Sequence, residues 1–202
     1  SDCYSLASIE IPNSVTSIGY FAFKGCYALK DVTIPRNVEV IGPYAFSSCI
    51  SLTSVTILAS IKYINIFVFG GCRALKEITI PSSVIRLCRG AFSDCESLTS
   101  VTFLGSIKSI GPDAFSGCKS LTSVTTRGNV KSIGSCAFSD CESLTSAEFG
   151  RIEQIDYQAF VYCAALKSIN IPSSVTSIHE EAFMGCNLQY IGVYSGSQSF
   201  NQ

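Results

Sequence analysis

Cysteine is the residue type in this sequence that offers the most chemistry, because a thiolate can act as a nucleophile, a metal ligand or half of a disulfide. Nine of the eleven cysteines recur at a constant interval, with a single step that is one position shorter: Cys3, Cys26, Cys49, Cys72, Cys95, Cys118, Cys141, Cys163 and Cys186. A single repeat position predicts a line of equivalent side chains through an interior, whereas a disulfide framework pairs different positions to close loops. We therefore predict a ladder of reduced thiols, with bridges between adjacent coils as the alternative.

The remaining two cysteines, Cys88 and Cys136, fall in predicted turns. They are the best candidates for exposed, reactive thiols, unless they merely reflect drift of the repeat. Cys136 and Cys141 flank four residues, but only Cys141 belongs to the inward ladder, so the pair does not predict a structural zinc site. We expect no metal and no cofactor.

The sequence contains few groups of residues that could form a catalytic site. The only histidine, His179, stands at a turn position beside Glu180 and Glu181, and the ladder cysteine of that coil, Cys186, is predicted to point to the core. No glycine-rich phosphate-binding motif occurs in the sequence. The residues thus predict a protein that is not an enzyme.

The elements that must position these residues repeat with the cysteines. Phenylalanine keeps the same interval, at Phe23, Phe46, Phe69, Phe92, Phe115, Phe138, Phe160 and Phe183. Leucine does so too, at Leu6, Leu29, Leu52, Leu75, Leu98, Leu121, Leu144 and Leu166. Three registers in phase predict about eight stacked coils that form one domain over residues 1–193, followed by a polar tail over 194–202.

One coil shows the expected local structure. Val32 and Ile34 alternate with a hydroxyl, as in a half-buried strand, and Pro35 should end that strand. A second short extended stretch follows over 38–41. The spacing of three between Phe46, Cys49 and Leu52 predicts a single helical or 3-10 turn. Stacked coils would place the first strands in a parallel sheet.

This pattern resembles the BspA-like (Treponema pallidum type) leucine-rich repeats. The clearest match is Ile171-Pro172-Ser173-Ser174-Val175-Thr176-Ser177-Ile178 with Ala182-Phe183-Met184-Gly185-Cys186, and the resemblance covers roughly residues 3–193. It implies a leucine-rich-repeat solenoid, a right-handed β/α superhelix with the parallel sheet on its concave face. It also implies display on the surface of bacteria or parasitic protists and adhesion to host proteins and cells.

The sequence departs from the pattern in one region. Pro35 has no counterpart at Leu58, Leu104 or Arg127, and the coil that contains 149–152 is one residue short. Thr126 places a hydroxyl at an interior strand position, where it needs a hydrogen-bond partner. We expect the sheet to be least regular between residues 124 and 152.

Composition limits the classes of function. The 202-residue chain is 47% hydrophobic with a net charge of −1, which excludes a disordered segment and a global attraction to nucleic acid. No apolar run has the roughly 18 residues of a membrane span. Because the chain begins Ser1-Asp2-Cys3 and its only methionine is Met184, we expect a piece of a longer protein, whose other parts would make any membrane attachment.

Function should reside on the outward side chains, because the inward ones are used for packing. The residue between the two inward strand positions predicts a binding row on the concave face: Thr33, Thr56, Thr79, Thr102, Thr125, Glu148 and Asn170. Strand propensity and cross-strand threonine pairs explain the same threonines without a ligand. A second row with Lys62, Lys108 and Lys131, near Arg86 and Arg89, could attract a sulfated glycan or an acidic partner, or could simply be solvated.

These features favour a protein-binding or adhesion module at a cell surface or secreted, with a host or extracellular-matrix protein as partner and no nucleic acid. The alternative is a cytoplasmic scaffold for protein–protein interaction, which reduced cysteines would suit. Weakly capped end coils would allow weak end-to-end self-association.

Overall fold

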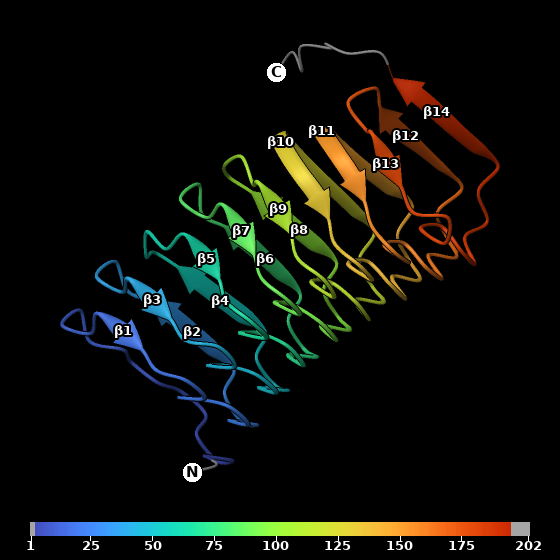
Figure 1. Cartoon of the computed structure of the whole chain (residues 1–202). Helices are drawn as coiled ribbons and strands as arrows, with labels where there is room; N and C mark the ends of the chain where they lie inside the picture. The colour runs from blue at the N-terminus through green and yellow to red at the C-terminus, as the bar shows by residue number, and fades with distance from the viewer. Residues whose placement is uncertain (1–2, 195–202) are drawn as a thin grey trace.

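The computed structural model describes residues 3–194 and winds them into a stack of coils that runs from the N- to the C-terminus (Figure 1). Each complete coil has a first strand, a shorter second strand and a series of turns that leads to the next coil. Residues one repeat apart therefore lie side by side, as in the pairing of Thr33 with Thr56.

Face A is the side that the first strands form. All of its strand pairs are parallel. Along β2 and β6, exposed and buried side chains alternate, as expected for a sheet with one face on the core. Its strands are β2 (Asp31–Ile34), β4 (Ser54–Ile57), β6 (Glu77–Ile80), β8 (Ser100–Phe103), the first part of β10 (Ser123–Ile133) and of β11 (Ser146–Ile155), β12 (Ser168–Pro172) and β14 (Tyr190–Tyr194).

The hydrogen bonding of face A is interrupted between some coils, and a proline accounts for one of these breaks. β2 pairs with β4, and β6 with β8, but β4 does not pair with β6. Leu58 donates its N–H to Ile34 at 3.0 Å. Pro81, one coil later, has no N–H to donate. β2 ends directly before Pro35, as predicted, whereas β12 includes Pro172.

Face B is the side that the second strands form. Each two-residue strand from β1 to β9 turns its second side chain into the core. β5, β7, β9, β10, β11 and β13 make one six-stranded sheet, and β1 pairs with β3. The bounds are β1 (Ser17–Ile18), β3 (Val40–Ile41), β5 (Tyr63–Ile64), β7 (Arg86–Leu87), β9 (Ser109–Ile110) and β13 (Ser177–Ile178).

The third side, which we call the turn side, corrects one expectation. The short helical or 3-10 turns predicted around each ladder phenylalanine do not occur among residues 3–194. Tyr44 and Ser48, on either side of Phe46, both have a positive φ. A positive φ breaks any run of right-handed helical residues. The N–H groups of these three residues instead donate to the following coil, at 2.9, 3.0 and 2.7 Å. The N–H groups of Ala45 and Ser47 bond three residues back, so bonds between coils alternate with single turns and no continuous helix forms.

The core contains the three registers that the sequence identified. The ladder phenylalanines from Phe46 to Phe160 are fully buried and stack on one another, with centroids 5.2 to 5.7 Å apart. Burying one such side chain stabilises the fold by roughly 1.5–3 kcal/mol. Because every coil adds the same layer, the core is continuous along the whole stack.

The predicted irregular region is confirmed at the pairing of β10 with β11. Thr126 lies opposite Phe149, but Asn129 lies opposite Arg151, so the register shifts by one residue between them. The shift accommodates the coil that is one residue short. In both β10 and β11 the strand continues without a break around the corner from face A to face B.

The predicted parallel-sheet solenoid is confirmed, with no helix among the described residues. The domain boundary predicted at residue 193 falls within β14, which ends at Tyr194. The rest of the predicted tail, 195–202, lies outside the described residues.

Candidate binding face

The central outward residues of the first strands form one row along face A. Each of them is exposed, and the strand register aligns them: Thr79 is opposite Thr102, and Thr125 is opposite Glu148. The row consists of Thr33, Thr56, Thr79, Thr102, Thr125, Glu148 and Asn170. The structure therefore brings every residue of the predicted binding row to one surface, on strands about 4.8 Å apart.

Two kinds of threonine hydroxyl occur on this face. At the start of the strands, Thr53 donates to Lys30 O and Thr99 to Lys76 O, each at 3.0 Å, and Thr122 and Thr145 repeat the contact. Those hydroxyls extend the backbone ladder. The threonines of the central row form no side-chain hydrogen bond with any residue from 3 to 194, so their hydroxyls are available to a ligand.

From β2 to β12 the surface of face A is polar, whereas β14 exposes Tyr190 and Ile191. A second outward row runs beside the first, with hydroxyls and carboxylates at Asp31, Ser54, Glu77, Ser100, Ser123, Ser146 and Ser168. From β2 to β12, the described strands of this face carry no exposed large apolar side chain. Such a surface binds through many adaptable hydrogen bonds rather than through an apolar anchor.

The cysteine ladder serves the core rather than chemistry. Each ladder thiol from Cys49 to Cys186 lies 3.0 to 3.3 Å from a phenylalanine carbonyl of the preceding coil, as Cys95 does from Phe69 O. Burial raises the pKa of Cys49 to about 12 and the pKa of Cys72 well above its ordinary value. The ladder cysteines from Cys26 to Cys186 form no disulfide with one another. The buried ladder thiols are therefore unreactive hydrogen-bond donors at neutral pH.

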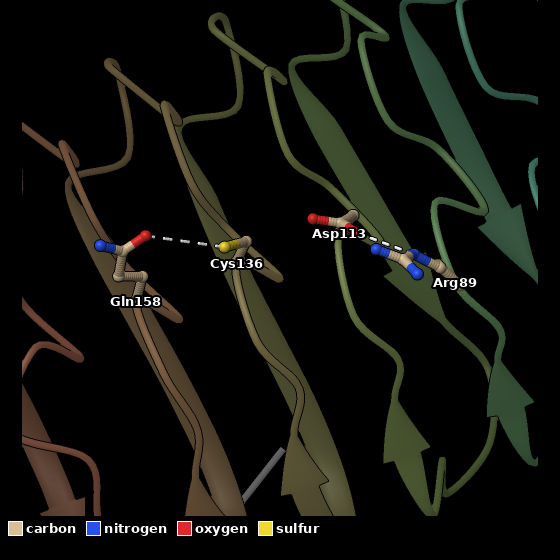
Figure 2. A network of polar contacts seen from close by, with 4 residues as sticks. All are labelled: Arg89, Asp113, Cys136 and Gln158. Atoms are coloured by element: carbon tan, nitrogen blue, oxygen red, sulfur yellow. Dashed lines mark hydrogen bonds and ion pairs between the residues drawn. The ribbon is translucent and has the colours of Figure 1, made fainter.

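The two cysteines outside the ladder are only partly exposed. Figure 2 shows Cys136 beside Gln158, with the Cys136 sulfur 3.9 Å from Gln158 Oε1. It also shows the ion pair of Arg89 and Asp113, in which Arg89 Nε lies 3.0 Å from Asp113 Oδ2. Burial raises the pKa of both Cys88 and Cys136. These thiols lack the lowered pKa of a reactive cysteine.

His179 is an exposed turn residue, as predicted. Its Nδ1 accepts the N–H of Glu181 at 3.3 Å, and its ring meets Tyr157 edge-on at 5.0 Å. Cys186 donates to Phe160 O instead of to the imidazole. Cys186 and His179 therefore do not form a hydrogen-bonded pair of nucleophile and base. Within residues 3–194 there is also no group of three or more potential metal ligands.

Sequence reasoning missed an aromatic row at the edge of face B. Phe21, Tyr44 and Phe67 share one repeat position and stack, with centroids 5.1 and 5.3 Å apart. The constant repeat interval between these three residues could have revealed the row. It was missed because they lie outside the ladder of inward phenylalanines, from which the core was predicted.

Comparison with known proteins places the chain in a family. The model of the BspA type leucine-rich repeat region matches six copies, over residues 1–104 and 86–202. Together these ranges cover the chain, which therefore belongs to the BspA-type leucine-rich repeat family. No protein of curated function matches it.

Two solved structures are similar over most of the chain. A leucine-rich repeat protein from Bacteroides ovatus ATCC 8483 is 27% identical, with a TM-score of 0.60 over 89% of this chain and 58% of its own. The T. pallidum leucine-rich repeat protein is 26% identical, with a TM-score of 0.62 over 90% and 77%. The chain thus spans little more than half the length of the B. ovatus protein.

No helix within residues 3–194 has both the length and the apolar character needed to cross a bilayer.

Proposed function

We propose that this chain is a protein-binding module that uses face A, displayed at a cell surface or secreted, with a host or extracellular-matrix protein as its partner. Leucine-rich repeat proteins generally act in protein–protein interaction, and membership of the family supports that part. The single observation that supports the choice of face is the straight, exposed row of seven polar residues from Thr33 to Asn170. Stacked coils hold such a row without any cost of ordering on binding.

The decisive experiment is an unbiased capture of partners on the purified chain, repeated with a variant of the row. Thr56→Lys, Thr79→Glu and Thr102→Lys together add bulk, and their alternating signs keep cross-strand neighbours attractive. The expected result is loss of the captured protein, with an unchanged unfolding midpoint.

A matched control changes three exposed residues on the turn side: Ile50→Lys, Ala164→Glu and Met184→Lys. It carries the same three charges and should retain the partner. Equal loss in both variants, or retention in both, would rule out face A as the binding surface.

An intracellular scaffold is the second candidate, and the reduced buried thiols of the ladder from Cys26 to Cys163 favour it. A count of free thiols on protein from its natural source, together with its location in the cell, separates the two. Ladder disulfides would argue against the scaffold, and a cytosolic location would argue against the adhesin.

The end coils support weak self-association of this chain. Ile9, Ile11, Val15 and Phe23 are only partly buried and line an open hollow of about 210 Å³ at the first coil. Apolar residues that are only partly buried also occur at the last coil, at Val175, Phe183 and Leu188. Contact between such ends would cover both sets. Light scattering over a range of concentrations should show growing mass, and a constant monomer mass would refute it.

A further inference from the structure

Face B carries a group of cations that lack partners. Four positive side chains, Lys62, Arg86, Lys108 and Lys131, follow one another along four successive coils and are all exposed. None of them takes part in the ion pairs among residues 3–194, which join other residues. On face B, the outward strand positions of these four coils contain no carboxylate; Glu39 and Glu153 stand beyond them. With strands about 4.8 Å apart, the charges lie within a Debye length of their neighbours and add to one field.

Apolar side chains are exposed directly beside these cations. Tyr63, 46% exposed, lies in register with Arg86 on the next strand. Val40 occupies the same position one coil earlier and is 51% exposed. Ile66, which follows β5, is also exposed. Large apolar groups that face solvent in one place indicate an interaction site.

The aromatic row of Phe21, Tyr44 and Phe67 continues this surface around the edge of face B. All three residues have a positive φ, of 56°, 58° and 48°. That conformation is unfavourable for bulky side chains. Glycine occupies the equivalent position in the next coil, at Gly90, where φ is also positive. Later coils hold Asp113, Cys136 and Gln158 at this position, again with a positive φ, so the conformation does not itself require a ring. One edge of Phe67 packs over Gly90, and the rest of its partly buried ring faces solvent.

We propose that this aromatic–basic surface, made of Val40, Lys62, Tyr63, Phe67, Arg86 and Lys108 with the neighbouring rings, binds an acidic polypeptide segment that carries apolar side chains. Carboxylates of the segment lie along the cations, and its apolar side chains pack on Tyr63 and the aromatic row. A sulfated glycan would match the cations but would leave the exposed apolar groups uncovered. Tyrosine and arginine side by side are also typical of the centre of protein interfaces. The surface is separate from face A and does not depend on the function proposed there.

The test uses the purified chain and a short fluorescent peptide in which pairs of glutamates alternate with phenylalanine and leucine. Two variants divide the surface: Lys62→Gln with Arg86→Gln removes cations, and Phe67→Gly removes a ring at a position where glycine relieves strain. We expect each variant to weaken binding of the peptide about tenfold or more. A peptide of the same length with glutamate and glycine alone should bind more weakly than the first.

Matched controls exist for both variants. Lys30→Gln with Lys167→Gln makes the same change in charge beside face A, and Tyr162→Gly removes an exposed aromatic side chain that also has a positive φ, of 58°. Both controls should bind the peptide like the original chain. Failure of the peptide to bind, or an equal effect of the controls, would overturn the proposal. Tighter binding of heparin that depends on the cations but not on Phe67 would overturn it in favour of a sulfated glycan.

Discussion

Two kinds of coil stand side by side in this solenoid. In the coils from β2 to β9 a corner separates the first strand from the second, and each strand has four or two residues. In β10 and β11 the two strands are joined into single strands of 11 and 10 residues. Figure 1 shows the joined strands in yellow and orange, between β9 and β13.

The difference teaches that the inward register matters more to this fold than the break between the first and second strands. On both sides of the shift between Thr126 and Asn129 the buried side chains still meet. Val124 lies opposite Ala147 before the shift, and Val130 lies opposite Ile152 after it. A deletion is therefore tolerated where the backbone can absorb it, provided that the layers of the core stay aligned.

The largest expected effect contrasts the phenylalanines of the two regions. Phe92 is fully buried and stacked between Phe69 and Phe115, whereas Phe149 in β11 is 8% exposed and lies tilted beside its neighbours. Phe92→Ala should lower the free energy of unfolding by about 3–5 kcal/mol, because it leaves a closed cavity. Phe149→Ala should cost less, because the fused strands can close around it. Urea unfolding of both variants measures the contrast, and equal losses would show that the two regions are equally rigid.

The buried thiols of the ladder should make both kinds of coil less stable at alkaline pH, and to a similar extent. Unfolded thiols ionise near a pKa of about 8.5, while burial holds the folded pKa of Cys49 at about 12. The contribution of each buried thiol to the free energy of unfolding is thus fully present below about pH 8.5 and is lost as the pH rises toward the folded pKa. The loss amounts to up to about 1.4 kcal/mol per pH unit for each thiol. The urea midpoint should fall steeply between about pH 8 and about pH 10.

Cys118→Ala in a regular coil and Cys141→Ala beside the fused strands should each reduce that slope, since each variant removes one buried thiol. A slope that neither variant changes would mean that other groups cause the alkaline loss.

Glycine at the fused strands is expected to have a smaller effect. A Cβ on Gly150 would lie 2.5 Å from Gly128 O, a backbone atom that cannot move aside easily. Gly150→Ala should therefore destabilise the chain by about 1–3 kcal/mol, as overpacking does. At Gly19 nothing lies within 4 Å of an added Cβ, so Gly19→Ala is the control and should be neutral or slightly stabilising. Thermal unfolding that ranks the two variants in the opposite order would contradict the packing of the fused strands.

The smallest effect should be a gain. The hydroxyl of Thr126 is buried in β10 without a hydrogen-bond partner in the described part of the chain, at the position where the sequence predicted a need for one. Thr126→Val keeps the shape and removes the unpaired group, so the free energy of unfolding should rise by about 1 kcal/mol. Thr122→Val, which removes a paired hydroxyl outside the core, serves as the comparison and should not stabilise. A loss of stability in Thr126→Val would indicate that its hydroxyl has a partner such as a buried water.

Much of this protein was determined by the sequence alone. The constant repeat interval identified the inward phenylalanines, cysteines and leucines, because only equivalent positions in stacked coils can share a core. The same interval placed Thr56 and Thr79 outward on one strand face, and the missing residue near Gly150 located the irregular coil. These features follow from periodicity, which a sequence displays directly.

The tertiary structure decided how the rest of the backbone satisfies its hydrogen bonds. The spacing of Phe46, Cys49 and Leu52 suits a helical turn, yet alternate N–H groups on the turn side, such as that of Phe46, bond to the next coil. Tyr44 has a positive φ, which interrupts a helix. The sequence of one coil contains no sign of that partner, because the partner belongs to another coil. The aromatic row and its neighbouring cations become one surface for the same reason: only stacking brings Phe21 and Phe67 onto the two sides of Tyr44.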